Sequence, residues 1–543
     1  MLLSLLLLLG TPLAGMADRI TPDFFRDKPR SLAKDFYISR FLDQNVTSSQ
    51  ARALLGEVKN MNWRLFHKFA ARVDDFPFER ISFCRKLSPL QFVGKENDCI
   101  KIGLTPYKAT KLPPEKLNRI ADQIAWQYPE DAALYRLISA RDFNRTCQSG
   151  AKRFLQLFNR VGNDYRQKYL NHPLPSHLVT EMSQEKGFNN AILKIVLDPK
   201  LTQLQRSILK LDASSLNAQS NFYLGLNALK LGHKEVAIWY FKAAEKKAWL
   251  DFDRDKARFW QYLLTRKKED LKALLKSRDL NLYTLYAYEK LGKSPKNIVT
   301  DIEPKRAKTP FDITDPFVWL QIQRQFKACS YADQKAKERA ALKLNAADTQ
   351  PHVARLLYTY GEHLHYFLTP YQQTVSSLSP RRKALLYAIA RQESRLIPTA
   401  ISYSYALGMM QFMPFLAKAV AKKKGIRDFK LEAMFHPDTA LNFANFHLDY
   451  LEKSLYHPLL LAYAYNAGIG YTRCNILQND HYFTAGEYEP FLSMEMLPNA
   501  QARKYGKRVL TNYVIYAKIF GAKDIRLLTL LEKLREKSRI SRF

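Results

Sequence analysis

Apolar residues recur at helical spacing along most of this chain, and this feature limits the possible folds more than any other. The segment PPEKLNRIADQIAWQYPED is typical, because Pro113 and Pro114 open a helix that Pro129 ends. Its apolar stripe consists of Leu117, Ile120, Ala121 and Ile124. Such segments follow one another from residue 18 to about 300. Each stripe needs a neighbouring helix to cover it, so we predict a mainly α fold built from paired helices.

One pair of helices has the pattern of a structural repeat. In NFYLGLNALKLGHKEVAIWYFKAAEKKAW, Gly232 separates two helices whose small residues fall where a hairpin would cross closely. The facing residues are Leu224, Gly225, Ala228, Ala237, Phe241 and Ala244. The offsets resemble the tetratricopeptide pattern, and a weaker copy ends at Gly292. We predict an α-solenoid or superhelix of hairpins, which either grips an extended partner or serves only as a rigid support.

The first residues have the composition of a secretory signal. An apolar stretch runs from Leu2 to Leu9, Gly10 and Pro12 follow it, and small residues precede Asp18. The stretch is too short to span a bilayer. We predict a signal peptide over residues 1–17 and no transmembrane anchor, with a hydrophobic first helix of the mature fold as the alternative.

The charge balance favours an anionic partner. The chain has 85 Lys and Arg against 51 Asp and Glu, a formal net charge of +34. Nucleic acid, acidic lipid headgroups and an acidic polymer all fit this sign. The basic residues are scattered along helices, and neither a basic tract nor a nucleic-acid-binding motif is present. Together with the predicted signal peptide, this argues against nucleic acid as the partner.

The cysteines and histidines show no metal-binding pattern. The five cysteines are Cys84, Cys99, Cys147, Cys329 and Cys474, without a CxxC pair. In an oxidising compartment Cys84 and Cys99 are the favoured disulfide by proximity, and the odd number leaves at least one free thiol. In EHLHYF, His363 and His365 are two residues apart and would point in different directions on a helix. We predict no metal and no other cofactor.

A lone carboxylate interrupts the apolar face of one helix. We predict that Ser379 caps this helix and that Pro380 is its first residue. Glu393 lies on the face formed by Leu385, Leu386, Ile389 and Leu396. Burial disfavours the charged form, so its pKa is expected to rise and to make it a general acid near neutral pH. Pairing with Arg391 or Arg395 is the structural alternative.

Four motifs around Glu393 carry a family resemblance. They occur in the order RQES at 391–394, GMMQFMP from residue 408, AYNAG at 464–468, and ARKYGKRVLTNYVIY from residue 502. Over about 368–525 the chain resembles the catalytic domain of the soluble lytic murein transglycosylases, which has a lysozyme-like fold. The preceding helical region fits the same family loosely. Met409 stands where the family has Leu, and Gln501 stands where it often has Glu.

The resemblance implies roles for individual residues. Glu393 would act first as the acid and then as the base. The substrate-binding residues would be Ser394, Ser402, Gly408, Met410, Gln411, Met413, Tyr465, Asn466 and Tyr505. Asp438, Asp449, Glu487 and Glu489 lie in the same region, but Glu495 is the best candidate for a second carboxylate, because the family has Glu there.

The implied activity is that of a periplasmic lytic transglycosylase. It would cleave the β-1,4 bond between N-acetylmuramic acid and N-acetylglucosamine in peptidoglycan without water and leave 1,6-anhydro ends. One alternative is hydrolysis on the same fold, as in goose-type lysozymes. Another is a helical-repeat scaffold that binds peptidoglycan with little activity. Besides peptidoglycan glycan strands, proteins of cell-wall synthesis or of a secretion machinery are candidate partners.

The predicted domain organisation follows these patterns. KSPKNIVTDIEPKRAKTPFDITDP lacks helical periodicity and is rich in proline and charge, so it marks the main boundary. We predict a signal peptide at 1–17, a helical superhelical domain at 18–294, a helical linker domain at 295–367, a lysozyme-like transglycosylase domain at 368–525 and a basic tail at 526–543 that frays.

Overall fold

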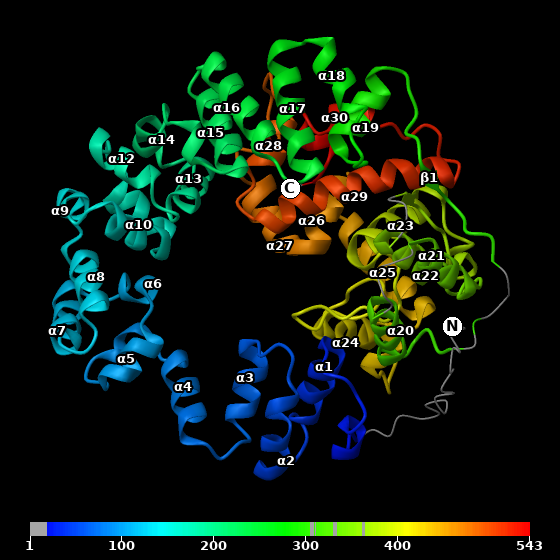
Figure 1. Ribbon diagram of the computed structural model, residues 1–543, viewed down its shortest axis with the longest axis horizontal. Helices are drawn as coiled ribbons and strands as arrows, with labels where there is room; N and C mark the ends of the chain where they lie inside the picture. Colours follow the sequence, from blue (N-terminus) through cyan, green and yellow to red (C-terminus); the bar gives the residue numbers. More distant parts are fainter. Residues whose placement is uncertain (1–18, 305–308, 310, 329–333, 361–363, 543) are drawn as a thin grey trace. The chain divides into compact units, whose positions relative to one another are not determined.

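The computed structural model describes residues 19–542 except 305–308, 310, 329–333 and 361–363 (Figure 1). The predicted signal peptide, Cys329 and His363 lie outside the described residues. The described chain is mainly α-helical, and the predicted fold class is confirmed. Strands β1 (Ile298–Val299) and β2 (His365–Tyr366) pair in parallel.

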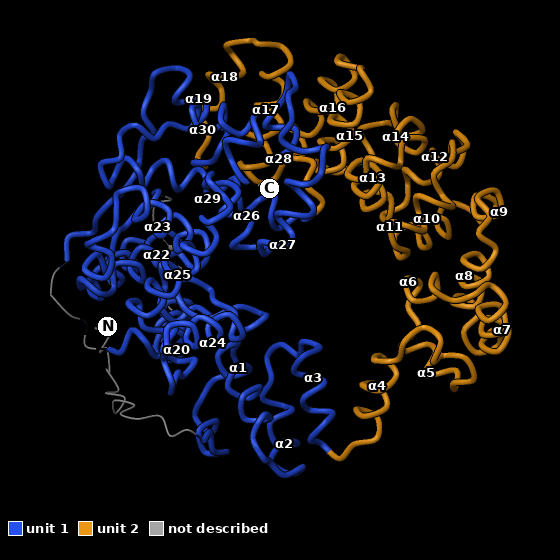
Figure 2. The backbone as a smooth tube through the Cα atoms, turned by 180° about the vertical axis from the view of Figure 1, so that it is seen from behind, with its two compact units in different colours: residues 1–73, 280–494, 499–543 blue, residues 74–279, 495–498 orange. Residues whose placement is uncertain are grey.

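The chain divides into two compact units (Figure 2). Unit 1 comprises residues 1–73, 280–494 and 499–543, of which the structure describes the ranges given above. Unit 2 comprises residues 74–279 and 495–498. The predicted domain boundaries at 294, 367 and 525 stay predictions.

Unit 2 is a row of short helices that pack in sequence order. They are α4 (Phe76–Lys86), α5 (Asn97–Gly103), α6 (Pro106–Ala109), α7 (Pro114–Ile124), α8 (Pro129–Ala140), α9 (Phe143–Gln148), α10 (Ala151–Arg160), α11 (Asn163–Tyr165), α12 (Ser176–Ser183), α13 (Phe188–Leu197), α14 (Thr202–Ser207), α15 (Ala218–Lys230), α16 (Lys234–Lys247), α17 (Asp251–Thr265) and α18 (Lys268–Leu274). The predicted stripe of α7 is buried, and Pro129 opens α8. The predicted helical hairpins are therefore confirmed.

The α15–α16 hairpin shows why small residues stand at its crossing. A Cβ atom placed on Gly225 would lie 2.6 Å from the ring of Phe241. Ala228, Ala237 and Ala244 are also buried. Glycine and alanine let the two helices approach closely, and the large apolar rings then fill the space beside them.

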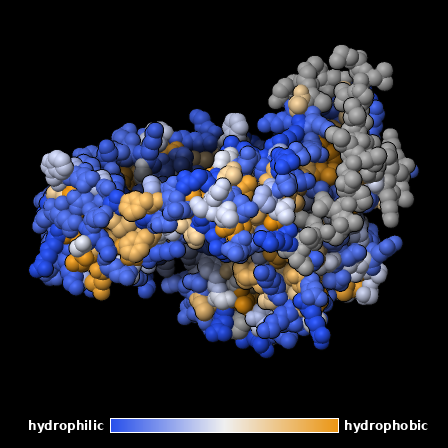
Figure 3. All heavy atoms as spheres, turned by 90° about the horizontal axis from the view of Figure 1, so that it is seen from below, coloured by the Kyte–Doolittle hydropathy of each residue, from blue (hydrophilic) through white to orange (hydrophobic). Residues whose placement is uncertain are grey.

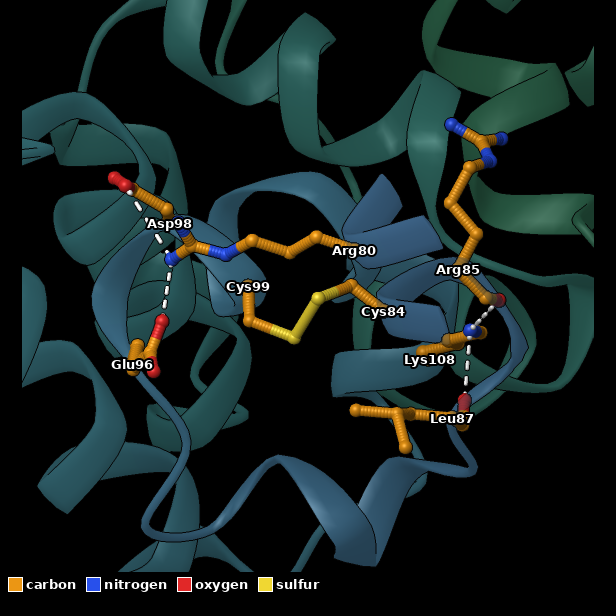
Figure 4. The surroundings of a disulfide bond; sticks show 8 residues. All are labelled: Arg80, Cys84, Arg85, Leu87, Glu96, Asp98, Cys99 and Lys108. Carbon is orange, nitrogen blue, oxygen red and sulfur yellow. Dashed lines mark hydrogen bonds and ion pairs between the residues drawn. A yellow bond between two sulfur atoms is a disulfide. The ribbon is translucent and has the colours of Figure 1, made fainter. Parts of the chain in front are cut away.

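A disulfide joins two helices of unit 2, as the sequence predicts. Cys84 on α4 and Cys99 on α5 are bonded, and both residues are buried. Arg80 forms ion pairs with Glu96 and Asp98 beside this bond (Figure 4). Cys147 and Cys474 are free thiols.

Replacing Cys84 with serine should destabilise unit 2. The disulfide closes a loop with a sequence separation of 15 residues. Opening a loop of this size costs about 3 kcal/mol of unfolding free energy in the chain-entropy model. Thermal unfolding with and without reductant measures the effect: the variant should melt lower and lose its response to reductant. Cys147→Ser is the control and should keep that response. Equal melting of oxidised wild type and Cys84→Ser would contradict the prediction.

Unit 1 contains the remaining helices. They are α1 (Leu32–Phe41), α2 (Ser48–Ala53), α3 (Trp63–Ala70), α19 (Leu282–Lys290), α20 (Pro316–Ala328), α21 (Gln334–Lys343), α22 (Gln350–Tyr360), α23 (Pro380–Ser394), α24 (Pro414–Lys423), α25 (Pro437–Glu452), α26 (Pro458–Ala467), α27 (Ile469–Tyr471), the first residues of α28 (Phe491–Met496), α29 (Ala500–Ile519) and α30 (Leu527–Lys533). The long helix α29 packs against α23 and α26 and forms the centre of the unit. Most of its residues are buried.

The prediction that the C-terminal tail frays is wrong. Helix α30 and the residues after it bury Leu527, Leu530, Leu531, Leu534 and Ile540. Ser541 forms a β-bridge with Leu455. The basic residues of the tail predicted that it would be exposed to solvent. Its apolar residues instead pack against a surface of the folded unit, and this surface exists only in the tertiary structure.

The surface agrees with the high charge of the sequence. The face shown in Figure 3 is mainly hydrophilic and is interrupted by small apolar patches. Within the described parts of the chain, no helix is both long and apolar enough to cross a membrane.

Candidate active site

Helix α23 begins and ends as its sequence predicts. Its N-cap is Ser379, whose hydroxyl accepts a hydrogen bond from the backbone N–H of Arg382 (3.3 Å), and Pro380 is its first residue. Leu385, Leu386 and Ile389 are buried. The apolar face anchors the helix against α29, and Glu393 lies partly exposed in the last turn of the helix.

Glu393 is a carboxyl group in a protein-lined environment. Burial raises its pKa from 4.5 to about 7, while a hydrogen bond from the hydroxyl of Tyr505 (2.7 Å to Oε1) lowers it. The guanidinium of Arg391 donates to the backbone oxygen of Tyr366 (2.8 Å) and to Oδ1 of Asn512 (2.7 Å). Burial therefore sets the direction of the shift, and about half of the molecules carry the proton on Glu393 at neutral pH.

Tyr505 comes from α29, 112 residues after Glu393. Asn499 caps this helix by accepting hydrogen bonds from the backbone N–H groups of Gln501 (2.9 Å) and Ala502 (3.0 Å). Gln501, at the position where the resemblance predicts Glu, is exposed in the first turn. The Tyr505 ring is buried, so its hydroxyl has a fixed direction toward Glu393.

The GMMQFMP segment forms a tight loop against the end of α23. Gly408 adopts a φ of +75°, and a Cβ atom there would lie 2.0 Å from the backbone oxygen of Met434. The hydroxyl of Ser394 donates to the backbone oxygen of Met409 (2.8 Å). Gln411 donates through Nε2 to the backbone oxygens of Ala400 (3.0 Å) and Gly408 (2.9 Å). The loop is therefore rigid, and Ser394 ties it to the helix of the acid.

The AYNAG motif ends α26 on the other side of this loop. The hydroxyl of Tyr465 donates to the backbone oxygen of Met410 (2.9 Å), 55 residues away. The charge of Glu393 raises the pKa of Tyr465, although burial is the larger cause. Asn466 is partly exposed and forms no side-chain hydrogen bond with the described residues. Tyr465 thus holds the loop, while the amide of Asn466 is available to a ligand.

Two further predicted residues flank the loop. Ser402 closes a turn, since its hydroxyl accepts from the backbone N–H of Ala406 (2.9 Å) and its own N–H donates to the Ala406 oxygen (3.0 Å). Met413 is the N-cap residue of α24 and is partly exposed. Six of the predicted residues therefore take part in the hydrogen bonds of the loop and of Glu393: Ser394, Gly408, Met410, Gln411, Tyr465 and Tyr505.

The sequence did not single out His447, which packs in the same region. Its ring lies 5.7 Å from that of Tyr465 and 6.0 Å from that of Phe412. Burial lowers its pKa to about 4, so it is neutral at pH 7. Its position on α25 among apolar residues resembles any buried histidine, and no sequence signal separates it from a core residue.

The other carboxylates have different surroundings. Asp438, Asp449 and Glu487 are exposed, and Asp449 forms an ion pair with Arg382 (2.9 Å). Glu489 is buried and accepts from the backbone N–H of Ser493 (3.3 Å). Glu495 is buried in the segment that belongs to unit 2, and its role as a second carboxylate stays a prediction.

The described residues contain no cluster of three or more His, Cys, Asp or Glu side chains that could hold a metal ion. The arrangement consists instead of one proton donor with a raised pKa, one tyrosine that hydrogen-bonds to it, and a rigid loop beside both. Such a group can protonate a leaving oxygen.

The transglycosylase SLT domain family model matches residues 377–484. This part of the chain is therefore similar to the transglycosylase SLT domain. The match covers the greater part of the predicted lysozyme-like domain and includes Glu393, Gln411 and Tyr465. Tyr505 lies beyond the matched residues of the SLT domain, and its place in the site comes from the packing of α29.

Curated relatives match part of the chain. The soluble lytic murein transglycosylase of Salmonella typhimurium is 28% identical over 302 residues, which cover 50% of this chain and 45% of the relative. The protein of that name from Escherichia coli K12 is 32% identical over 138 residues, or 25% and 21% of the two chains. The chain thus spans less than half the length of the curated relatives it matches.

Solved structures with a similar trace are lytic transglycosylases. An inactive mutant of Slt from Pseudomonas aeruginosa has a TM-score of 0.48 and 17% identity, covering 91% of this chain and 87% of that one. The 70 kDa soluble lytic transglycosylase from Escherichia coli has a TM-score of 0.47 and 16% identity, covering 94% and 89%.

Proposed function

We propose that this protein is a lytic transglycosylase that cleaves the β-1,4 bond between N-acetylmuramic acid and N-acetylglucosamine in peptidoglycan and leaves 1,6-anhydro ends. The observation that carries the proposal is the carboxyl group of Glu393, which has a pKa of about 7 and lies beside Tyr505. The SLT match and the names of the relatives support the substrate class. A periplasmic location and peptidoglycan strands as the partner belong to the same proposal.

A single acid suffices because the substrate supplies the other groups. Glu393 donates its proton to the glycosidic oxygen, and the bond from C1 to that oxygen breaks. The 2-acetamido oxygen of N-acetylmuramic acid stabilises the cation that develops at C1. Glu393, now a carboxylate, takes the proton from the C6 hydroxyl while that oxygen bonds to C1. Attack within one sugar has a high effective molarity, so neither water nor a protein nucleophile is needed.

The surrounding residues would prepare the substrate for this reaction. Asn466 and Gln411 have amide groups at the loop, and Met413 is partly exposed beside them. The hydroxyl of Tyr505 stabilises the carboxylate form of Glu393 by its hydrogen bond, which favours release of the first proton. The rigid loop keeps these groups in place before the substrate arrives.

Mass spectrometry of muropeptides released from purified sacculi tests the reaction. The proposal expects products one water lighter than those of a lysozyme digest. Hydrated products would retain Glu393 as the acid but require a second carboxylate, for which Glu495 is the first to test. The absence of any released product would favour the peptidoglycan-binding scaffold.

Replacing Tyr505 with phenylalanine should lower turnover about tenfold or more, because a hydrogen bond to a charged group is worth about 1.5–3 kcal/mol. Since the Tyr505 hydroxyl lowers the pKa of Glu393, the variant should also deprotonate its acid at higher pH. A pH profile of turnover measures both effects.

Tyr516→Phe is the matched control for this variant. Tyr516 lies on the same helix and donates to the backbone oxygen of Leu368 (3.0 Å), away from Glu393. The Tyr516→Phe variant should be less stable than the wild type but keep the wild-type pH profile of turnover. An unchanged profile in Tyr505→Phe would show that Tyr505 does not tune the acid.

A further inference from the structure

Three large apolar side chains are exposed beside the active-site loop. Trp63 at the start of α3 is 50% exposed, Met61 before it is 39% exposed, and Tyr403 is 68% exposed. The Trp63 ring packs edge-on against that of Phe66 (5.3 Å between centroids), which helps to fix its orientation. We call Trp63 and Tyr403 the aromatic strip. Exposed apolar groups that gather in this way often mark a binding surface.

Direct contacts join the two parts of the strip. Nδ2 of Asn62 donates to the backbone oxygen of Tyr403 (3.1 Å). The ring of Phe36 on α1 lies 6.1 Å from that of Tyr405, two residues further on. Arg40 on α1 also forms an ion pair with Glu432, and Figure 1 shows α1 next to α24. Helix α1 and the start of α3, which carries Trp63, therefore contact the segments around Tyr403 and Glu432.

The strip continues from the site around Glu393. Tyr403 follows Ser402 in a turn, and this turn leads into the loop of Gly408 and Gln411. That loop is tied to α23 through Ser394. A chain of contacts thus leads from Glu393 through the loop to Tyr403 and then, through Asn62, to Trp63.

We propose that Trp63 and Tyr403 form a stacking surface for sugar rings of the glycan strand outside the cleavage site; this inference rests on the proposed function. A flat aromatic ring presents a large apolar face with a partial negative charge, which matches the C–H-rich face of a pyranose. Arg64 is exposed next to Trp63. Burial raises the pKa of Tyr405, and the charge of Arg64 opposes this shift, so that charge acts on the same loop. It would favour the carboxylates of the attached peptides.

The test compares long and short ligands. Binding of long peptide-free glycan strands and of a tetrasaccharide is measured by calorimetry on the full chain carrying Glu393→Gln, which prevents turnover. Trp63→Ala should weaken binding of long strands roughly two- to twelvefold, since an aromatic contact is worth about 0.5–1.5 kcal/mol, and leave the tetrasaccharide unchanged. Trp63→Phe should restore most of the affinity because it keeps an aromatic face.

Trp126→Ala is the control for a lost surface tryptophan. Trp126 belongs to unit 2 and is 94% exposed. Its replacement should leave the affinities for both ligands unchanged. Equal binding of long strands by Trp63→Ala and its parent would overturn the inference, as would an equal loss for both ligands. In either case anhydro products from the wild type would leave the proposed function intact. If the wild type releases no product and the Glu393→Gln protein binds neither ligand, the proposed function fails, and the inference that rests on it fails too.

Discussion

Replacing Glu393 with glutamine is expected to lower glycan cleavage by roughly 10³-fold while leaving glycan binding within about twofold, because a positioned general acid contributes about 10²–10⁴ to a rate. Glutamine keeps the size of the side chain and its capacity to accept a hydrogen bond from Tyr505. It cannot give a proton to the leaving oxygen. Release of muropeptides from sacculi measures turnover, and calorimetry with glycan strands measures binding.

The same variant should change the pH dependence of stability. The pKa of Glu393 is about 7 in the folded state against 4.5 for an ordinary glutamate. The folded protein therefore binds this proton more tightly than the unfolded chain, and wild-type stability falls as the pH rises from 4.5 through 7. Above pH 7 the variant should be more stable than the wild type by up to about 3 kcal/mol, and near pH 4.5 the difference should vanish. Denaturant unfolding at both pH values measures this.

Glu489→Gln separates the role of Glu393 from the effect of losing a buried carboxylate. Glu489 lies in the same unit, burial raises its pKa, and it accepts a hydrogen bond from the backbone of Ser493. This control should also gain stability at high pH but keep full activity. Turnover close to wild type in Glu393→Gln would mean that another residue is the acid.

The second large effect is expected for Gly408→Ala. The φ of +75° costs an L-residue about 1–2 kcal/mol. The new Cβ atom would also lie 2.0 Å from the backbone oxygen of Met434, so the loop or its neighbour must move. We expect a loss of about 3 kcal/mol or more in unfolding free energy. Because Gln411 is bonded to the oxygen of Gly408, activity should fall as well.

Gly425→Ala is the matched control for backbone strain alone. Gly425 has a φ of +71°, and a Cβ atom there meets nothing within 4 Å. The Gly425→Ala variant should lose about 1–2 kcal/mol of unfolding free energy and keep its activity. Equal unfolding free energies for the two variants would show that the close approach to Met434 contributes nothing.

Local patterns predicted the helices well because the information lies within each segment. The cap at Ser379 with Pro380 behind it specifies where α23 begins. The small residues of the α15–α16 hairpin predicted a close crossing, which the contact between Gly225 and Phe241 confirms. The spacing of apolar residues also predicted that Glu393 would face inward. Burial by itself then predicted that its pKa would be raised.

Distant contacts needed the tertiary structure. The sequence resemblance placed Tyr505 among the substrate-binding residues, and the packing of α29 on α23 brings its hydroxyl to Glu393. Similarly, the basic residues of the tail predicted fraying, whereas its apolar residues are buried by neighbours far away in the chain.

The sequence by itself therefore determined the helical class, the start of α23 and the hairpins of unit 2, since caps and periodicity act within a few residues, and it predicted Glu393 as the acid. The tertiary structure alone decided which groups surround that acid, how the N-terminal helices contact the loop through Asn62 and Tyr403, and whether the tail is ordered. Those contacts depend on surfaces that exist only after the helices have packed, and residues far apart in the sequence carry no local signal of them.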